Sequence, residues 1–199
     1  MNWLAHLFLA QPNVESRLGN LLGDLVKGKE RENLNVGFQS GLKCHLAIDR
    51  FTDRHIIVKR SKQRIDPKYC RFAGILIDVF YDHFLAINWD KYSPVPLEEF
   101  TATIYASLQD YLDTLPIYAS SVISRLIAED WLGSYRHLSG VENTLKRISW
   151  KLTRRTNKQY NLTPAIREIT QNYAELEQDF LDFFPQLILH IDNWYVANS

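Results

Sequence analysis

The chain contains few cysteines: Cys44 and Cys70 are the only two among its 199 residues. They lack the C-x-x-C spacing of zinc and redox motifs, and they are too few for a disulfide framework. We therefore expect both to be reduced thiols in a protein core. The chain also lacks internal repeats and low-complexity tracts, and its composition excludes a disordered chain.

Long hydrophobic runs are absent as well. No segment approaches the ~18 apolar residues of a membrane span. The apolar start over residues 1–10 has no basic region before it and is broken by His6, so it does not match a signal peptide. The 23 basic and 23 acidic residues leave no net charge, which by itself indicates no class of partner. We expect a soluble, cytoplasmic protein that binds neither membranes nor nucleic acid.

Apolar residues make up 46% of the chain and recur with the spacing of helices. This is enough apolar side chain for one domain with a substantial core. No strand-length alternation or hairpin turn signal interrupts the pattern. We predict a single all-α domain over residues 1–199, with a solvated loop over 28–36. Helices are expected over residues 2–10, 14–27, 38–64, 71–89, 97–114, 117–130, 141–158, 163–180 and 185–197.

One predicted helix carries an imidazole and two carboxylates along a single edge. His45, Asp49 and Asp53 follow one another at steps of four residues. Side chains at that spacing are neighbours on a helix, with Cβ atoms about 5–6 Å apart. Charged groups are rarely buried unless they are paired or bound to a metal ion. The edge is therefore a candidate metal site, although Arg50 and Arg54 could instead pair with these acids at the surface.

A second helix repeats the arrangement with Asp78, Asp82 and His83. Asp24 and His6, on two earlier apolar segments, add further ligand types. Oxygen-rich sets with one or two imidazoles suit Mg²⁺, Mn²⁺ or Fe²⁺ better than a thiolate-bound zinc. Because two helices show the same pattern, a metal site between them is favoured over surface ion pairs.

Several blocks of sequence, in the same order, resemble the acyl carrier protein phosphodiesterase family. The resemblance covers essentially the whole chain. The chain departs from the family pattern at Phe8, where family members often have the second histidine of a His-x-His pair. The blocks are Asn2-x-Leu4-Ala5-His6-Leu7, Gly19-Asn20-Leu21-Leu22-Gly23-Asp24-x-Val26-x-Gly28, His45-x-x-Ile48-Asp49-x-x-Thr52-Asp53, Asp78-Val79-x-x-Asp82-His83-Phe84-Leu85, Trp131-Leu132-x-x-Tyr135, Tyr173-x-x-Leu176-x-x-x-Phe180 and Phe184-Pro185.

The resemblance implies hydrolysis of the phosphodiester that links 4′-phosphopantetheine to a serine of holo-acyl carrier protein. It also implies an HD-like helical bundle, as in the HD-type phosphohydrolases, with Mn²⁺ as the favoured cofactor and Mg²⁺ or Fe²⁺ as alternatives. The metal ligands we predict are Asp24, His45, Asp49, Asp82 and His83. His6, Asp53 and Asp78 are predicted as catalytic groups that orient ligands or transfer protons, with direct ligation left open.

Two basic stretches are candidates for docking, because acyl carrier proteins are acidic. The alternatives are a solvated helix face, a nucleic-acid patch, or pairing with the acidic C-terminal part of this chain. The residues predicted to bind the partner are Lys59, Arg60, Arg64, Arg147, Lys151, Arg154 and Arg155.

Two other functions remain open at the level of sequence. An HD-like phosphohydrolase of a nucleotide or other small phosphoester would need no carrier protein. A non-catalytic binder of the carrier protein would need no metal ligands, so the intact set of acids and histidines disfavours it.

Overall fold

The apolar stripes of the sequence pack against one another as helices around one hydrophobic core. The computed structural model describes residues 1–32 and 34–198, and this part of the chain contains no strand, which confirms the all-α prediction. The α-helices are α1 (Trp3–Leu9), α2 (Val14–Leu25), α3 (Lys29–Glu32), α4 (Val36–Arg54), α5 (Ile56–Gln63), α6 (Ala73–Ile87), α7 (Leu97–Gln109), α8 (Ile117–Ala128), α9 (Trp131–Ser134), α10 (Leu138–Thr156), α11 (Ile166–Gln171) and α12 (Tyr173–Asn198).

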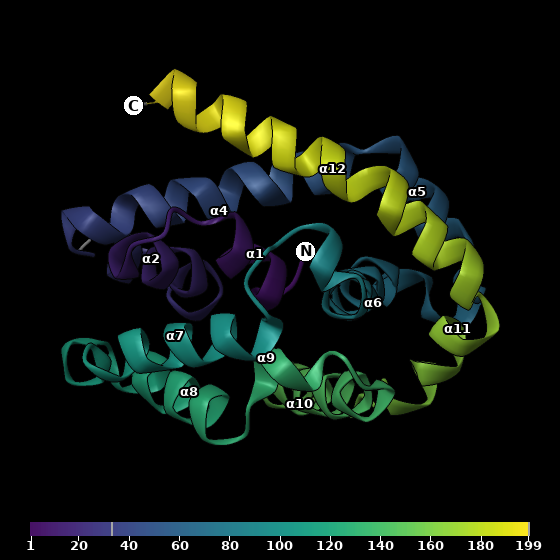
Figure 1. Cartoon of the computed structure of the whole chain (residues 1–199). Coiled ribbons are helices and arrows are strands. Elements are labelled where there is room, and N and C mark those ends of the chain that lie inside the picture. The colour runs from purple at the N-terminus through teal and green to yellow at the C-terminus, as the bar shows by residue number, and fades with distance from the viewer. Residues whose placement is uncertain (33, 199) are drawn as a thin grey trace.

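Figure 1 shows how the helices are layered. The C-terminal helix α12 arches over α4 and α5, and α7, α8 and α10 lie on the opposite side. The short helix α1 lies between these layers and packs against both α2 and α6. The first residues of the chain are therefore at the centre of the molecule.

Helices α2 and α4 cross at unusually short range because glycines face one another across the contact. A Cβ atom on Gly41 would lie 2.0 Å from the Ser16 carbonyl oxygen, and one on Gly19 would lie 2.1 Å from the Phe38 carbonyl oxygen. Neither approach is sterically possible for a larger residue. The two glycines therefore set the spacing of α2 and α4, which carry Asp24 and the acid/histidine edge.

Helix α12 differs from the prediction at Pro185. We expected one helix to end near residue 180 and another to begin at 185, but α12 continues through the proline. Proline inside a helix costs about 3 kcal/mol because it removes a backbone donor and crowds the preceding turn. The adjoining Phe180, Phe183 and Phe184 are fully buried, and burial of such side chains contributes about 1.5–3 kcal/mol each. Core packing offsets the local cost.

Three smaller predictions also needed correction. The helix expected over 38–64 divides at His55, whose Nδ1 accepts a hydrogen bond from the Ile57 N–H at 3.3 Å and so begins α5. The expected loop over 28–36 contains α3, and residue 33 lies outside the described residues. Cys44 is buried as expected, but Cys70 is exposed.

Helices α5 and α12 are joined by a buried carboxylate, Asp179, whose side chain is 1% exposed. It accepts hydrogen bonds from the Arg60 Nε at 2.7 Å, the Arg64 Nε at 2.9 Å and the Ser61 hydroxyl at 2.8 Å. The Ser61 oxygen also lies 2.7 Å from the Tyr81 hydroxyl of α6. Three helices thus meet in one polar network inside the core.

The sequence predicts no segment that is long and apolar enough to span a membrane. Among the residues that the structure describes, no helix is both long and apolar enough to cross a bilayer.

Candidate functional site

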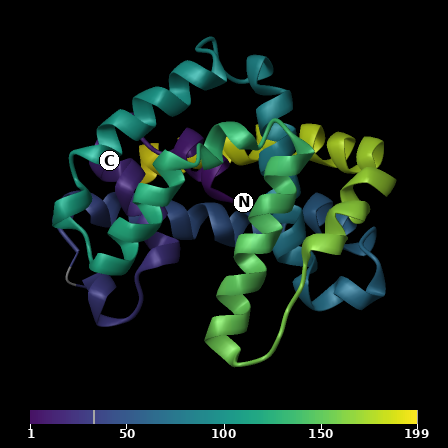
Figure 2. The same ribbon diagram turned by 90° about the horizontal axis from the view of Figure 1, so that it is seen from below.

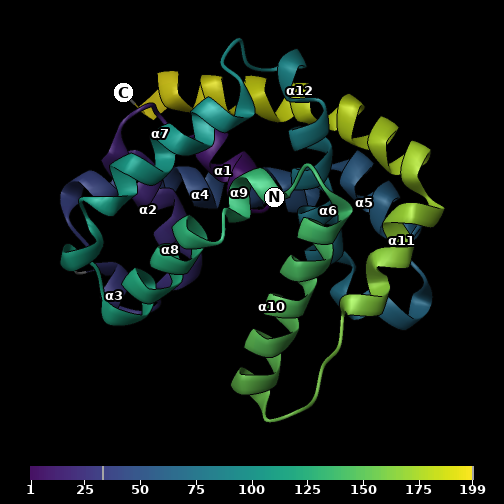
Figure 3. The ribbon, with the colours of Figure 1, turned by 60° about the horizontal axis from the view of Figure 1, so that its bottom comes forward.

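A cleft of about 1190 Å³ is lined by α10 and by the helices that carry the acidic residues. Figures 2 and 3 show α10 projecting from the body of the protein, on the side where the N-terminus lies. One wall carries acids from α2, α4 and α6, and the other carries basic residues from α8 and α10. The acids are Asp24, Asp49, Asp53 and Asp78, and the bases are Arg125, Lys146, Arg147, Lys151, Arg154 and Arg155.

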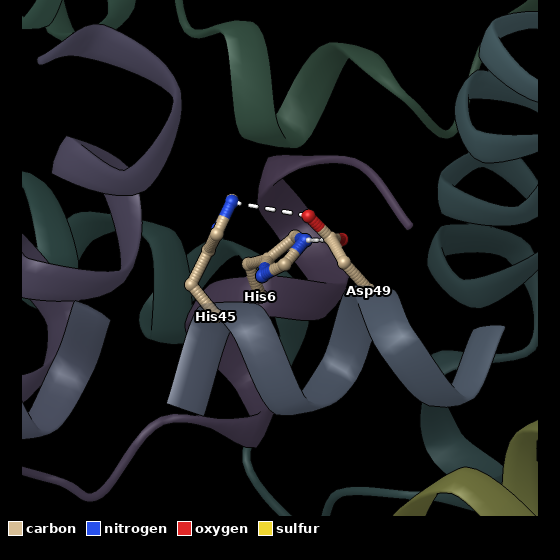
Figure 4. A group of neighbouring side chains, drawn as sticks. All are labelled: His6, His45 and Asp49. Atoms are coloured by element: carbon tan, nitrogen blue, oxygen red, sulfur yellow. Dashed lines mark ion pairs between the residues drawn. The ribbon is translucent and has the colours of Figure 1, made fainter. Parts of the chain in front are cut away.

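Three ligand-type side chains converge at the acidic wall. His45 and Asp49 come from successive turns of α4, and His6 reaches the same point from α1 (Figure 4). The Asp49 carboxylate oxygens lie 3.1 Å from the His45 Nε2 and 3.2 Å from the His6 Nε2. The three ligand atoms lie within 4.8 Å of one another. One metal ion can contact all three from this position.

The hydrogen bonds around His6 leave its inward nitrogen without a conventional partner. The Asn20 Oδ1 accepts a hydrogen bond from His6 Nδ1 at 2.7 Å, so Nε2 is the nitrogen that faces Asp49. When the His6 ring is neutral, the Nε2 lone pair and the Asp49 carboxylate face each other as two acceptors. The imidazole is 1% exposed and its Nε2 makes no hydrogen bond. A cation, either a proton or a metal ion, satisfies both acceptors.

The electrostatic surroundings keep Asp49 ionised. Burial raises the pKa of its carboxyl, but the neighbouring imidazoles of His45 and His6 and the charge of the N-terminal amine together bring it far below its ordinary value. A carboxylate in this form is the protonation state that a metal ion requires.

Two structural details hold the histidines in place. The Asp82 carboxylate accepts hydrogen bonds from the Leu4 and Ala5 N–H groups at 2.7 and 3.3 Å, which fixes the first turn of α1 and so the position of His6. The ring of His45 fills the space beside Gly23, where a Cβ atom would lie 2.5 Å from the ring. The two rings then stack with centroids 4.4 Å apart.

Asp24 lies at the edge of this group. Its Oδ1 is 4.0 Å from the His45 Nε2, and its Oδ2 accepts a hydrogen bond from the Trp3 indole at 2.8 Å. The side chain is 44% exposed, so it can turn toward a bound ion or toward a substrate in the cleft.

The other predicted catalytic acids line the same cleft but belong to ion pairs. Asp78 binds the Met1 amine at 2.9 Å, and Asp53 binds Lys62 at 3.2 Å. Neither joins the group of His6, His45 and Asp49. Both remain candidates for contacts with a substrate.

The structure does not bring Asp82 and His83 to the group. Both Asp82 oxygens accept backbone hydrogen bonds at the start of α1, and burial raises the pKa of this carboxyl to about 7. His83 Nδ1 lies 2.7 Å from the Tyr135 carbonyl oxygen and Nε2 lies 2.9 Å from the Tyr173 hydroxyl. Both ring nitrogens of His83 are therefore engaged within the protein, away from the group of His6, His45 and Asp49. Asp82 thus holds the start of α1, and His83 links α6 to Tyr135 and Tyr173.

The two basic stretches predicted to bind a partner differ in the structure. Arg60 and Arg64 are bound to Asp179 within the protein, as the alternative of internal pairing anticipated. Lys59 is exposed on α5 and is not among the residues that line the cleft. Arg147, Lys151, Arg154 and Arg155 all line the cleft on α10.

Sequence reasoning missed the supporting roles of Trp3, Asn20 and Gly23. Each lies in a block that carried the family resemblance. A residue that acts by supporting a neighbour, however, shows no characteristic spacing in the sequence. Phe8 stands where family members often have the second histidine of the His-x-His pair. Its ring centroid lies 5.4 Å from that of Trp89 and 5.8 Å from that of Phe184. It therefore belongs to the core.

Comparison with known proteins places the chain in a family. The family model described as acyl carrier protein phosphodiesterase matches residues 1–187. The chain is similar to proteins of that name from Photorhabdus laumondii (30% identity over 194 residues, 97% of this chain and 96% of the relative) and Yersinia enterocolitica (33% over 189 residues, 94% and 96%). The protein of that name from Escherichia coli O157:H7 is 31% identical over 189 residues, 94% of this chain and 96% of the relative.

No solved structure matches the chain, so the HD-like arrangement stays a prediction. The family match extends over both walls of the cleft, because α1, α4 and α10 all lie within residues 1–187. The chain belongs to the acyl carrier protein phosphodiesterase family of hydrolases.

Proposed function

We propose that the protein hydrolyses the phosphodiester of holo-acyl carrier protein, releasing 4′-phosphopantetheine and leaving apo-carrier protein. The observation that carries the proposal is the convergence of His6, His45 and Asp49 at one wall of a large cleft whose other wall is basic. The names of the relatives point to the same substrate.

The donor set suits a divalent metal ion such as Mn²⁺, with Mg²⁺ or Fe²⁺ as alternatives. His6 Nε2, His45 Nε2 and the Asp49 carboxylate are the proposed ligands, with Asp24 close enough to add an oxygen. His6 Nε2 is buried without a hydrogen-bond partner, which supports a cation at this point. Asn20, bound to the other nitrogen of His6, holds the ring as carboxylates and carbonyls do for metal-bound histidines.

A metal ion bound there supplies Lewis-acid chemistry, lowering the pKa of water from about 16 toward 7 and offsetting charge on phosphate oxygens. In the reaction, water adds to phosphorus, the bond from phosphorus to the serine oxygen breaks, and that oxygen takes up a proton. Asp24 and Asp78 line the cleft beside the ligand group. We propose them as the groups that accept the proton from water and return one to serine.

Recognition of the carrier protein is assigned to the exposed face of α10. Lys151, Arg154 and Arg155 are exposed there and have no carboxylate within 4.0 Å among the described residues. Beside them Trp150 is 56% exposed, with the Arg154 guanidinium 4.7 Å from its ring centroid. An exposed tryptophan among cations is typical of a docking surface for an acidic partner.

The reaction is tested by the intact mass of purified holo-acyl carrier protein after incubation with this protein and Mn²⁺. We expect the mass of phosphopantetheine to be lost, and EDTA to prevent the loss. Cleavage of small phosphodiesters with the carrier protein left intact would favour a small-substrate phosphohydrolase. Binding of the carrier protein without turnover at any metal concentration would favour a non-catalytic binder.

Charge reversal on α10 tests docking. We expect Lys151→Glu combined with Arg154→Glu to raise KM for holo-carrier protein about tenfold at low salt, since opposed charges steer association. The effect should shrink as salt screens the charges, and kcat should change little. Lys59→Glu on α5 is the matched control, and an equal effect of this variant would refute the assignment to α10.

A further inference from the structure

Arg147 differs from the other cations of α10 because its side chain is half-buried. The residue lines the cleft, with its guanidinium carbon 4.0 Å from the ring centroid of Trp131. One guanidinium nitrogen donates a hydrogen bond to the Thr144 hydroxyl at 2.6 Å. By contrast, Lys151 and Arg154 on the same helix are exposed. Arg147 is therefore held by two contacts within the cleft, whereas Lys151 and Arg154 present their charges to solvent.

The guanidinium of Arg147 makes no direct ion pair with the described residues. Among residues 1–32 and 34–198, no carboxylate lies within 4.0 Å of Arg147. Glu129, an acid on the same wall, is bound by Arg125 at 3.2 Å and by the Trp131 indole at 2.7 Å. Burial lowers the pKa of Arg147. A partly buried cation that no carboxylate contacts directly favours the binding of an anion.

Two packed tryptophans, Trp131 and Trp3, connect Arg147 to the acidic wall of the cleft. The Trp131 ring stacks on the Trp3 ring with centroids 5.8 Å apart, and the Trp3 indole donates to Asp24. Trp131 is buried, and its indole N–H is bound to Glu129. A line of contacts thus joins Arg147 to the group of His6, His45 and Asp49 along the cleft.

We propose that Arg147 binds the phosphate of the phosphopantetheine arm and positions it in the cleft; this rests on the proposed function. A guanidinium has five donors in a planar fork that suits phosphate oxygens, and among the described residues Thr144 alone accepts a hydrogen bond from it. Cations that meet the carrier protein itself belong on the exposed face of α10. The phosphate is the anion that the arm carries into the cleft.

The proposal is tested with the full chain and the reaction product, which requires no turnover. We expect Arg147→Met to bind 4′-phosphopantetheine about 10- to 100-fold more weakly than the wild type, as for loss of hydrogen bonds to a charged group. Pantetheine, which lacks the phosphate, should bind the variant and the wild type equally. Added methylguanidinium should partly restore turnover by Arg147→Met, which a merely structural role does not predict. Arg167→Met, an exposed residue outside the cleft, is the control.

Two outcomes overturn the assignment. In the first, Arg147→Met binds 4′-phosphopantetheine as tightly as the wild type. In the second, the variant loses affinity for holo-carrier protein while its affinity for the product is unchanged, which would mean that the guanidinium contacts the carrier protein. If the wild type leaves holo-carrier protein intact, the proposed function fails separately. The anion site is then decided with inorganic phosphate, whose binding must still weaken in Arg147→Met.

Discussion

Replacing Asp49 with asparagine is expected to abolish phosphodiesterase activity almost completely, by about 10³-fold or more. Its carboxylate lies between His6 and His45, with oxygens 3.2 and 3.1 Å from their Nε2 atoms. The amide keeps the volume of the side chain but removes the charge that a divalent ion requires. Metal ions supply several kcal/mol of transition-state stabilisation, and each 1.36 kcal/mol changes a rate about tenfold.

The measurement is calorimetric titration with Mn²⁺ beside the activity assay, so that metal binding and turnover are followed separately. We expect both to be lost in Asp49→Asn, while the circular dichroism of a helical protein is kept. Asp192→Asn, on the exposed face of α12, is the matched control and should behave as wild type. Unchanged Mn²⁺ affinity in Asp49→Asn would show that the ion binds elsewhere.

Replacing Asp179 with alanine is expected to give the largest loss of stability, about 3 kcal/mol. Removing one partner of a buried ion pair typically costs about 3–5 kcal/mol, because the remaining charges and hydroxyls lose their partners. The low end applies here, since the Arg60 and Arg64 side chains are 48% and 30% exposed and can regain water. For a chain of this size the melting temperature should fall by roughly 6–12 °C.

The matched control for Asp179→Ala is Asp182→Ala on the same helix. Asp182 is 43% exposed, contacts the outer edge of Arg60 at 3.3 Å and accepts a hydrogen bond from the exposed Gln178 amide at 2.8 Å, so its loss should cost at most about 1 kcal/mol. Chemical denaturation of both variants gives the comparison. Equal midpoints for the two variants would contradict the assigned role of the buried network.

The pH dependence of the Asp179 effect follows from its partners. Burial raises the pKa of this carboxyl, but hydrogen bonds from Arg64, Ser61 and Arg60 outweigh it and lower the pKa below the ordinary value. A group with a lowered folded pKa stabilises the protein above its unfolded pKa and loses that contribution as the pH falls through the folded pKa. The difference between the wild type and Asp179→Ala should therefore be complete near neutral pH and shrink only below about pH 4.

The helical class and one edge of the site could be predicted from the sequence, because both depend on short-range spacing. Apolar residues at intervals of three and four predict helices wherever they pack. His45 and Asp49 are neighbours on α4 for the same reason, and they do meet. Helix ends were predicted less well, since the division at His55 depends on a single side-chain cap and the continuity through Pro185 depends on core packing.

The tertiary structure decided which residues join that edge. Asp82 and His83 have the same local pattern as the first edge, but α6 is buried on nearly all sides, so their polar atoms satisfy backbone and tyrosine groups instead. His6 reaches Asp49 because α1 is held by Asp82 and because α2 and α4 approach closely through glycines. The sequence by itself thus determined the helices and the pair on α4, because helical spacing is local. Only the fold decided that His6 joins this pair and that a basic wall faces it, because those contacts join segments far apart in the chain.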